Sequence, residues 1–222
     1  MSIPSDFRGL HLPRRLAQLY AGLALYGVSA ALLVRAGLGL EPWGVLHQGL
    51  AGLTGLSMGV VSIAVGAAVL LLWIPLRQRP GLGTVSNVVA VGIALDAALA
   101  TIPDGRGTAV RAAMLGTGIV LNGAATGLYI AARFGPGPRD GLMTAVHRLT
   151  GRSVRLVRTA IELTVVATGF TLGGTVGIGT VAYALAIGPL AQLFLRVFAV
   201  PAADGGSAVV TTGSPGQAIL RR

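Results

Sequence analysis

A charged pair, Arg139–Asp140, stands in the stretch FGPGPRDGLM (residues 134–143), where two prolines and three glycines interrupt a strongly apolar chain. Backbone groups released from helical hydrogen bonds are tolerated at membrane depth only where protein or a wet cavity satisfies them. A guanidinium in such a break offers planar donors to an anionic group. The pair indicates a gate or a substrate clamp, and a solvated cytoplasmic turn is the alternative interpretation.

A second break, LGLEPWGVL (residues 38–46), has the same outline and brings Glu41, Trp43 and His47 close together in the sequence. We include Glu41 and Trp43 among the residues expected along a path for a solute or an ion. A tryptophan at this depth is more often an interface anchor than a stacking platform. The second break therefore carries two interpretations as well.

Two glycine-rich helix starts, RPGLGT and VGIGT, end in Thr84 and Thr180. Helix N-termini present unpaired N–H donors and a partial positive charge, so these starts could hold a carboxylate or a phosphate. Small residues also let neighbouring helices approach closely, and this packing role is favoured over ligand binding.

Polar side chains inside apolar segments form a third set, and an acid within a membrane is a functional-site hypothesis by default. Glu162 has Arg158 one turn earlier, so a local i,i+4 ion pair is an ordinary explanation for it. Asp96 could couple protons or cations, or could reach the outer interface. Asn87 and Asn122 could each bond a solute or a neighbouring helix.

The composition excludes several classes of protein. Hydrophobic residues make up 53% of the chain and charged residues 11%, against about a quarter charged in soluble domains. There is no cysteine, the three histidines form no metal set, and no catalytic triad, phosphate loop or dinucleotide motif occurs. We therefore expect no enzyme activity, metal or cofactor. The net charge of +10 records membrane orientation more often than nucleic acid binding, which we do not expect.

Six apolar segments are long enough to cross about 30 Å of hydrocarbon. They are residues 16–34, 58–76, 83–101, 112–132, 155–173 and 178–198. Segments 41–55 and 137–150 are shorter and more polar, and predict interfacial or re-entrant helices. With the N-terminus inside, only Arg35, Arg106 and Arg111 of the 17 basic residues fall outside. This bias predicts a multi-pass protein of the bacterial cytoplasmic membrane with both termini cytoplasmic.

An internal repeat relates the two breaks. A shift of 96 residues places Pro42 over Pro138 and the stretch GLGTV (81–85) over GIGTV (177–181). Each half carries three spans, and because three is odd the second half must enter the membrane from the opposite side. We expect an all-α fold with two inverted-topology three-helix repeats, at 16–101 and 112–198. They are flanked by a cytoplasmic segment, 1–15, and a disordered tail, 199–222.

Several stretches together resemble a known family: RAGLGLEPWGVLHQGLA, WIPLRQRPGLGT, FGPGPRDGLMTAVHRLTGRSVRLVRTAIEL and GGTVGIGT. Over about residues 14–196 they are similar to the YczE/YyaS/YitT group of bacterial integral membrane proteins, above all its YczE branch. The resemblance implies a multi-span membrane protein with transport suspected. The family pattern has Pro-Trp-Asp in the first half, whereas this chain has Pro42-Trp43-Gly44. The resemblance thus implies that the acid is kept only as Asp140, or is moved to Glu41.

The repeat favours a small secondary transporter or permease that moves a small solute by alternating access. A coupling ion, membrane lipids and a homodimer are the partners left open. Since the chain has no ATP-binding motif, a gradient or a separate subunit would supply the energy. The alternative is a non-transporting scaffold or assembly factor, whose docking surface would be the Arg-rich loop between Arg133 and Arg158.

Overall fold

The computed structural model describes residues 12–198, which form eight α-helices and no strand. The helices are α2 (Leu12–Ala36), α3 (Pro42–Thr54), α4 (Met58–Trp73), α5 (Leu82–Thr101), α6 (Thr108–Ala131), α7 (Pro138–Thr150), α8 (Val154–Thr171) and α9 (Ile178–Phe198). The all-α prediction is confirmed for this part of the chain, and the two short segments become α3 and α7. Most of the predicted N-terminal segment, residues 1–11, and the whole predicted tail, 199–222, lie outside the described residues.

Four helices, α2, α5, α6 and α9, are long and apolar enough to cross a membrane. The other two predicted spans fall short of this measure. Helix α4 has 16 residues, and α8 carries Arg155, Arg158 and Glu162 within its 18 residues. Helices α3 and α4 together are apolar enough but bend by 114° at the break between them, as in a broken span or a re-entrant pair. Four of the six predicted spans therefore have support, and the remaining two stay predictions.

The same succession of four helices occurs twice. Helices α2 to α5 begin at residues 12, 42, 58 and 82, and α6 to α9 begin at 108, 138, 154 and 178, each 96 positions later. The caps match as well, because Gly55 and Gly151 end α3 and α7 with φ angles of 72° and 65°. Ser57 and Ser153 then cap α4 and α8 with their hydroxyls. These local signals place a sharp turn at equivalent points of each half.

The two halves interlock through their breaks. The Gly83 N–H at the start of α5 donates to the Phe134 carbonyl at 2.9 Å, and the Gly179 N–H at the start of α9 donates to the Leu38 carbonyl at 2.8 Å. Since residues 38 and 83 are equivalent to 134 and 179, the same bond forms in both directions between the halves. Each break is thus held by a helix of the other half.

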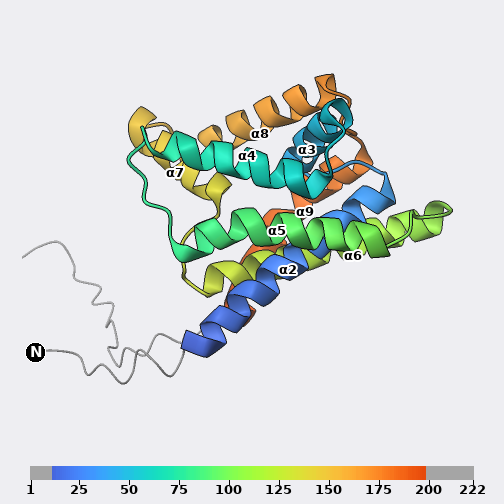
Figure 1. Cartoon of the computed structure of the whole chain (residues 1–222), viewed down its shortest axis with the longest axis horizontal. Helices are drawn as coiled ribbons and strands as arrows, with labels where there is room; N and C mark the ends of the chain where they lie inside the picture. The colour runs from blue at the N-terminus through green and yellow to red at the C-terminus, as the bar shows by residue number, and fades with distance from the viewer. Residues whose placement is uncertain (1–11, 199–222) are drawn as a thin grey trace, which may run out of the picture.

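Helices α2, α5, α6 and α9 form one layer, and α3, α4, α7 and α8 form a second layer beside it (Figure 1). Glycines set the spacing in the first layer. A Cβ at Gly22 of α2 would lie 2.8 Å from the Tyr129 nitrogen of α6, and one at Gly127 would lie 2.7 Å from Phe194 of α9. Small residues allow this close approach, which drives helix association in membranes.

One pair of equivalent interfaces differs between the halves. Helix α4 packs along α5, where a Cβ at Gly92 would lie 2.6 Å from the Gly59 carbonyl oxygen. The equivalent helices α8 and α9 do not pack along each other. Their equivalent positions are Arg155 and Gly188, and a Cβ at Gly188 would meet open space. The structure is closed between α4 and α5 and open between α8 and α9.

The contact between α4 and α5 includes Asp96, whose carboxylate accepts from Ser57 Oγ at 2.5 Å and from the Gly59 N–H at 2.7 Å. We expect Asp96→Asn to lower the free energy of unfolding by about 1.5–3 kcal/mol, the usual contribution of hydrogen bonds to a charged group. Unfolding by SDS or heat in detergent measures the loss.

The matched control for Asp96→Asn is Asp104→Asn. The Asp104 side chain also accepts an ion-pair contact, from Arg35 at 2.7 Å, but it is 79% exposed. Exposed pairs of this kind contribute below about 1 kcal/mol. Equal losses in the two variants would show that Asp96 does not tie α4 to α5.

Candidate functional site

A cavity of about 330 Å³ lies between the two breaks and extends into the gap between α8 and α9. Seven of the residues predicted from the sequence line it: Glu41, Trp43, Asn87, Arg139, Asp140, Arg158 and Glu162. Four others lie elsewhere: Thr84, Asp96, Asn122 and Thr180. The volume is at the lower end of the range for small-molecule sites, about 300–1,000 Å³. The cavity brings the charged residues of both halves together.

The first turn of α7 supplies Arg139 and Asp140. Pro138 fixes φ at the helix start, which favours a sharp entry into the helix. The Tyr129 hydroxyl of α6 donates to Asp140 Oδ2 at 3.0 Å. A Cβ at Gly137 would lie 3.3 Å from the same oxygen, so this glycine leaves room for the carboxylate. The acid also lies at the positive end of the helix dipole.

The matching turn of α3 places its acid differently. Glu41 precedes α3, is only 4% exposed, and does not cap the helix with its side chain. Its carboxylate folds back over Gly44, where a Cβ would lie 2.7 Å from Oε2. Gly44 is the repeat equivalent of Asp140, and Glu41 is the equivalent of Gly137. The first half therefore fills the missing acid's place with a carboxylate that starts three residues earlier.

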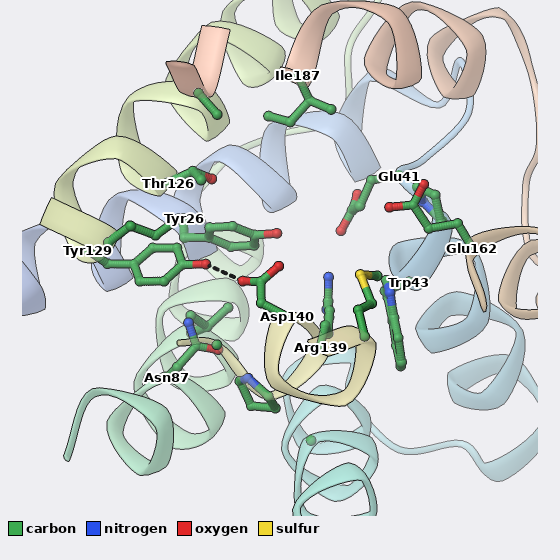
Figure 2. A pocket seen from close by; sticks show the side chains of 18 of the residues that line it. Tyr26, Glu41, Trp43, Asn87, Thr126, Tyr129, Arg139, Asp140, Glu162 and Ile187 are labelled. Carbon is green, nitrogen blue, oxygen red and sulfur yellow. Dashed lines mark hydrogen bonds between the residues drawn. The ribbon is translucent and has the colours of Figure 1, made fainter. Parts of the chain in front are cut away.

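Arg139 lies between the two carboxylates and stacks on Trp43, with its Cζ 4.9 Å from the indole ring centroid. Figure 2 shows the guanidinium between Asp140 and Trp43, directed toward the part of the cavity where Glu41 lies. Among the described residues Arg139 makes no side-chain hydrogen bond and no ion pair. A planar cation with free donors in a partly buried site suits an anionic group.

Arg158 and Glu162 form the i,i+4 ion pair expected from the sequence, with Nε and Oε1 2.9 Å apart. Both also line the cavity where it passes between α8 and α9. Glu162 is the repeat equivalent of Gly66, which packs against Val88 of α5 in the closed interface. The Arg158–Glu162 ion pair therefore lies where α8 and α9 are apart, whereas Gly66, at the equivalent position of the first half, packs against α5.

The four predicted residues outside the cavity lining make structural hydrogen bonds, within a helix start or between helices. Thr84 Oγ1 donates to the Pro136 carbonyl at 2.8 Å, and Thr180 Oγ1 accepts from the Gly177 N–H at 3.2 Å. Asn122 donates to Ser29 Oγ and accepts from the Tyr183 hydroxyl, both at 2.8 Å. Asp96 ties α4 to α5. Each has a structural partner where it lies.

Three tyrosines and a histidine line the cavity without having been selected from the sequence: Tyr26, Tyr129, Tyr183 and His47. Tyr26 and Tyr129 meet edge to face with ring centroids 6.4 Å apart. The chain has only four tyrosines, and three of them face this cavity from helices far apart in the sequence. The low number of tyrosines was the one signal in the sequence that could have identified them as cavity residues. It is a weak signal, because a tyrosine in an apolar segment is usually interpreted as an interface anchor.

No three His, Asp or Glu side chains converge as metal ligands in residues 12–198. Along the cavity wall the charged groups are two guanidiniums and three carboxylates, within reach of tyrosine hydroxyls. Such an arrangement can hold charged groups of a small solute by ion pairs and hydrogen bonds, with Val65, Val69 and Ile187 offering apolar surface.

Burial raises the pKa of the Glu41 carboxyl above its ordinary 4.5, and the Arg139 guanidinium opposes part of that rise. A raised folded pKa gives stability that is complete below about pH 4.5 and is lost as the pH rises through the folded pKa. Glu41→Gln cannot ionise. We therefore expect the melting temperature of the variant to gain on that of the parent as the pH rises through this window.

Thermal unfolding in detergent at a series of pH values measures this difference. The other titrating groups near Glu41, namely Asp140, Glu162, His47 and Arg139, are present in both proteins, so their contributions largely cancel. A pH profile that is parallel for the two proteins would contradict a buried, raised Glu41.

Comparison with known proteins identifies a family that spans most of this chain. Residues 13–196 match the family of unknown function DUF6198. An uncharacterised protein of Haemophilus influenzae is 38% identical over 181 residues, 82% of this chain and 83% of the relative. The uncharacterised membrane protein YczE of Bacillus subtilis is 32% identical over 179 residues, 79% of this chain and 83% of the relative.

A further relative, the uncharacterised protein YyaS of Bacillus subtilis, is 24% identical over 180 residues, 79% of this chain and 90% of the relative. No solved structure matches the chain significantly. The matches to YczE and YyaS agree with the resemblance carried by the two breaks, and the four apolar helices agree with a membrane protein. The chain belongs to the YczE-like membrane proteins of the family DUF6198.

Proposed function

We propose that the protein is a small secondary transporter or permease that moves a small solute by alternating access between two inverted repeats. In this proposal six helices span the bacterial cytoplasmic membrane, both termini are cytoplasmic, and the second repeat is inverted because each repeat has an odd number of spans. The solute binds in the cavity between the two breaks, as in transporters built from such repeats.

The observation that carries the proposal is the difference between equivalent interfaces. Helices α4 and α5 pack closely at Gly59, Gly92 and Asp96, which closes the cavity on that side. Helices α8 and α9 are apart, and the cavity is open between them. Two halves of like sequence can exchange these arrangements at modest free-energy difference. In the exchanged state α8 packs on α9 and α4 leaves α5, so the cavity opens from the other side.

Paired cysteines test the exchange, and the chain has none of its own to interfere. A Cβ at Gly66 would lie 3.5 Å from Val88 Cβ, within the roughly 3.5–4.5 Å that a disulfide needs. The pair Gly66→Cys with Val88→Cys should therefore link readily in the state described here. The equivalent pair, 96 residues later, is Glu162→Cys with Ala184→Cys, whose helices are apart in this state.

We expect the second pair to link more slowly than the first but to completion, because it traps molecules that visit the exchanged state. Arg155→Cys with Gly188→Cys, equivalent to Gly59 and Gly92, repeats the test with Glu162 intact. The single-cysteine variants are the controls. If neither late pair links while the first links fully, the protein has one state, and the scaffold becomes the better description of its role.

A further inference from the structure

Two oppositely charged side chains face this cavity without an ion pair or a hydrogen bond to another side chain of the described residues. Arg139 makes no side-chain hydrogen bond or ion pair among residues 12–198. Glu41 is only 4% exposed, and its carboxylate makes no hydrogen bond or ion pair with another side chain among these residues. A buried charge is costly unless it is paired. Both groups line the same cavity, one from each break. A ligand that forms an ion pair with each of them would offset the cost of burying the two charges.

The other charged side chains of the cavity already have a side-chain partner. Arg158 is paired with Glu162, and Asp140 accepts a hydrogen bond from the Tyr129 hydroxyl. Around the centre, Arg139, Asp140 and Glu41 together carry a net charge of −1 when all are ionised. A simple anion at Arg139 would increase this negative charge. A simple cation at Glu41 would leave the guanidinium without an acceptor.

We propose that the cavity binds a small zwitterion of the amino-acid class, with its carboxylate on the Arg139 guanidinium and its ammonium group on the Glu41 carboxylate. The inference rests on the proposed function and names the class of solute for that same site. A carboxylate accepts the two parallel N–H donors of a guanidinium. The ammonium group lies at Glu41, and Asp140 and the tyrosine hydroxyls offer further acceptors. Val65, Val69 and Ile187 line the same cavity and offer apolar surface to the side chain of such a solute.

Three matched probes test the class on the purified wild-type chain in detergent. Leucine carries both charges, 4-methylpentanoate keeps only its carboxylate, and 3-methylbutylamine keeps only its ammonium group. A ligand that binds the folded protein stabilises it by RT ln(1 + [L]/Kd), so the shift grows with the logarithm of the ligand concentration over Kd. We expect leucine or another neutral amino acid, among glycine, alanine and phenylalanine, to raise the melting temperature. The two half-probes should need at least about tenfold higher concentration for the same shift.

Tryptophan emission gives a second readout at the site. The chain has two tryptophans, so Trp73→Phe leaves Trp43, stacked under Arg139, as the reporter. A zwitterion on the guanidinium should change this emission, and Arg139→Gln or Glu41→Gln should abolish the change. Asp104→Asn, on an exposed ion pair, is the matched control and should leave it intact. Because the probe comparison uses the wild-type chain, it does not depend on any variant folding.

Equal potency of leucine and a half-probe would overturn the zwitterion proposal, as would silence from every amino acid in the panel. The cysteine pairs separate this failure from failure of transport. If the late pairs still link while no amino acid binds, alternating access stands and the solute class is wrong. If an amino acid binds with the required dependence but the late pairs never link, the solute class stands and transport fails.

Discussion

Gly169→Ala is expected to lower the free energy of unfolding by about 3 kcal/mol, at the upper end of the usual cost of overpacking. A Cβ at this position would lie 2.6 Å from Leu46 Cα and 2.6 Å from the Val45 carbonyl carbon. These are backbone atoms of α3, which cannot rotate away as a side chain can. The methyl group therefore has to push α8 off α3.

The control for this substitution is Gly116→Ala, in the interior of α6, where a Cβ would meet nothing within 4 Å. Alanine is a better helix former than glycine by about 1 kcal/mol in water, so this variant should be as stable as the parent or more so. SDS unfolding of both proteins gives the comparison. Equal stability of Gly169→Ala and Gly116→Ala would show that α3 and α8 have room to separate without cost.

The residue at position 169 and its repeat equivalent at position 73 account for a second difference between the halves, the closeness of α3 to α8 and of α7 to α4. Gly169 is the repeat equivalent of Trp73, and Val45 is the equivalent of Gly141. Helix α8 offers a glycine to α3, whereas α4 offers Trp73 to Gly141 of α7, and a Cβ at Gly141 would overlap the indole ring. Trp73 is 1% exposed and donates from Nε1 to the Pro138 carbonyl at 3.2 Å. The large side chain holds α7 at a distance from α4, while α3 lies close on α8.

The positions of the helices could be predicted because strong local signals mark them. Pro42 and Pro138 begin α3 and α7, and Gly55 and Gly151 end them. The apolar blocks between these points have the length of spans. The repeat predicted that both breaks line one path, with Glu41 toward the outer side and Arg139 and Asp140 toward the cytoplasmic side. In the structure the three side chains line a single cavity.

Contacts between distant residues could not be predicted in this way. Asp96 lies 37 residues from Gly59, and no pattern in the sequence links an acid near the end of α5 to the start of α4. Tyr26, Tyr129 and Tyr183 each fall in an apolar helix, where tyrosine has the same appearance whether it faces lipid, a headgroup or a cavity. The direction of a side chain around its helix depends on neighbours that a single sequence does not reveal.

Gly44→Asp gives the first half an acid at the repeat equivalent of Asp140 and is expected to destabilise this protein by about 3 kcal/mol or more. Its Cβ would lie 2.7 Å from Glu41 Oε2, and its carboxylate would place a second negative charge in a site where Glu41 is already 4% exposed. A buried charge without compensation costs about 3–5 kcal/mol. The space beside Arg139 has room for only one carboxylate from the first half, and Glu41 already fills it.

Removal of the first carboxylate should reverse the effect. Glu41→Gly with Gly44→Asp gives the first half the acid–glycine order of the second half, in which Gly137 leaves room for Asp140. The coupling free energy of the two substitutions should therefore favour the double variant by about 1–3 kcal/mol, the range for residues in direct contact. A double-mutant cycle of unfolding free energies measures it. If the two losses simply add, the carboxylates do not compete for one place, and Glu41 has not taken over the position of the missing acid.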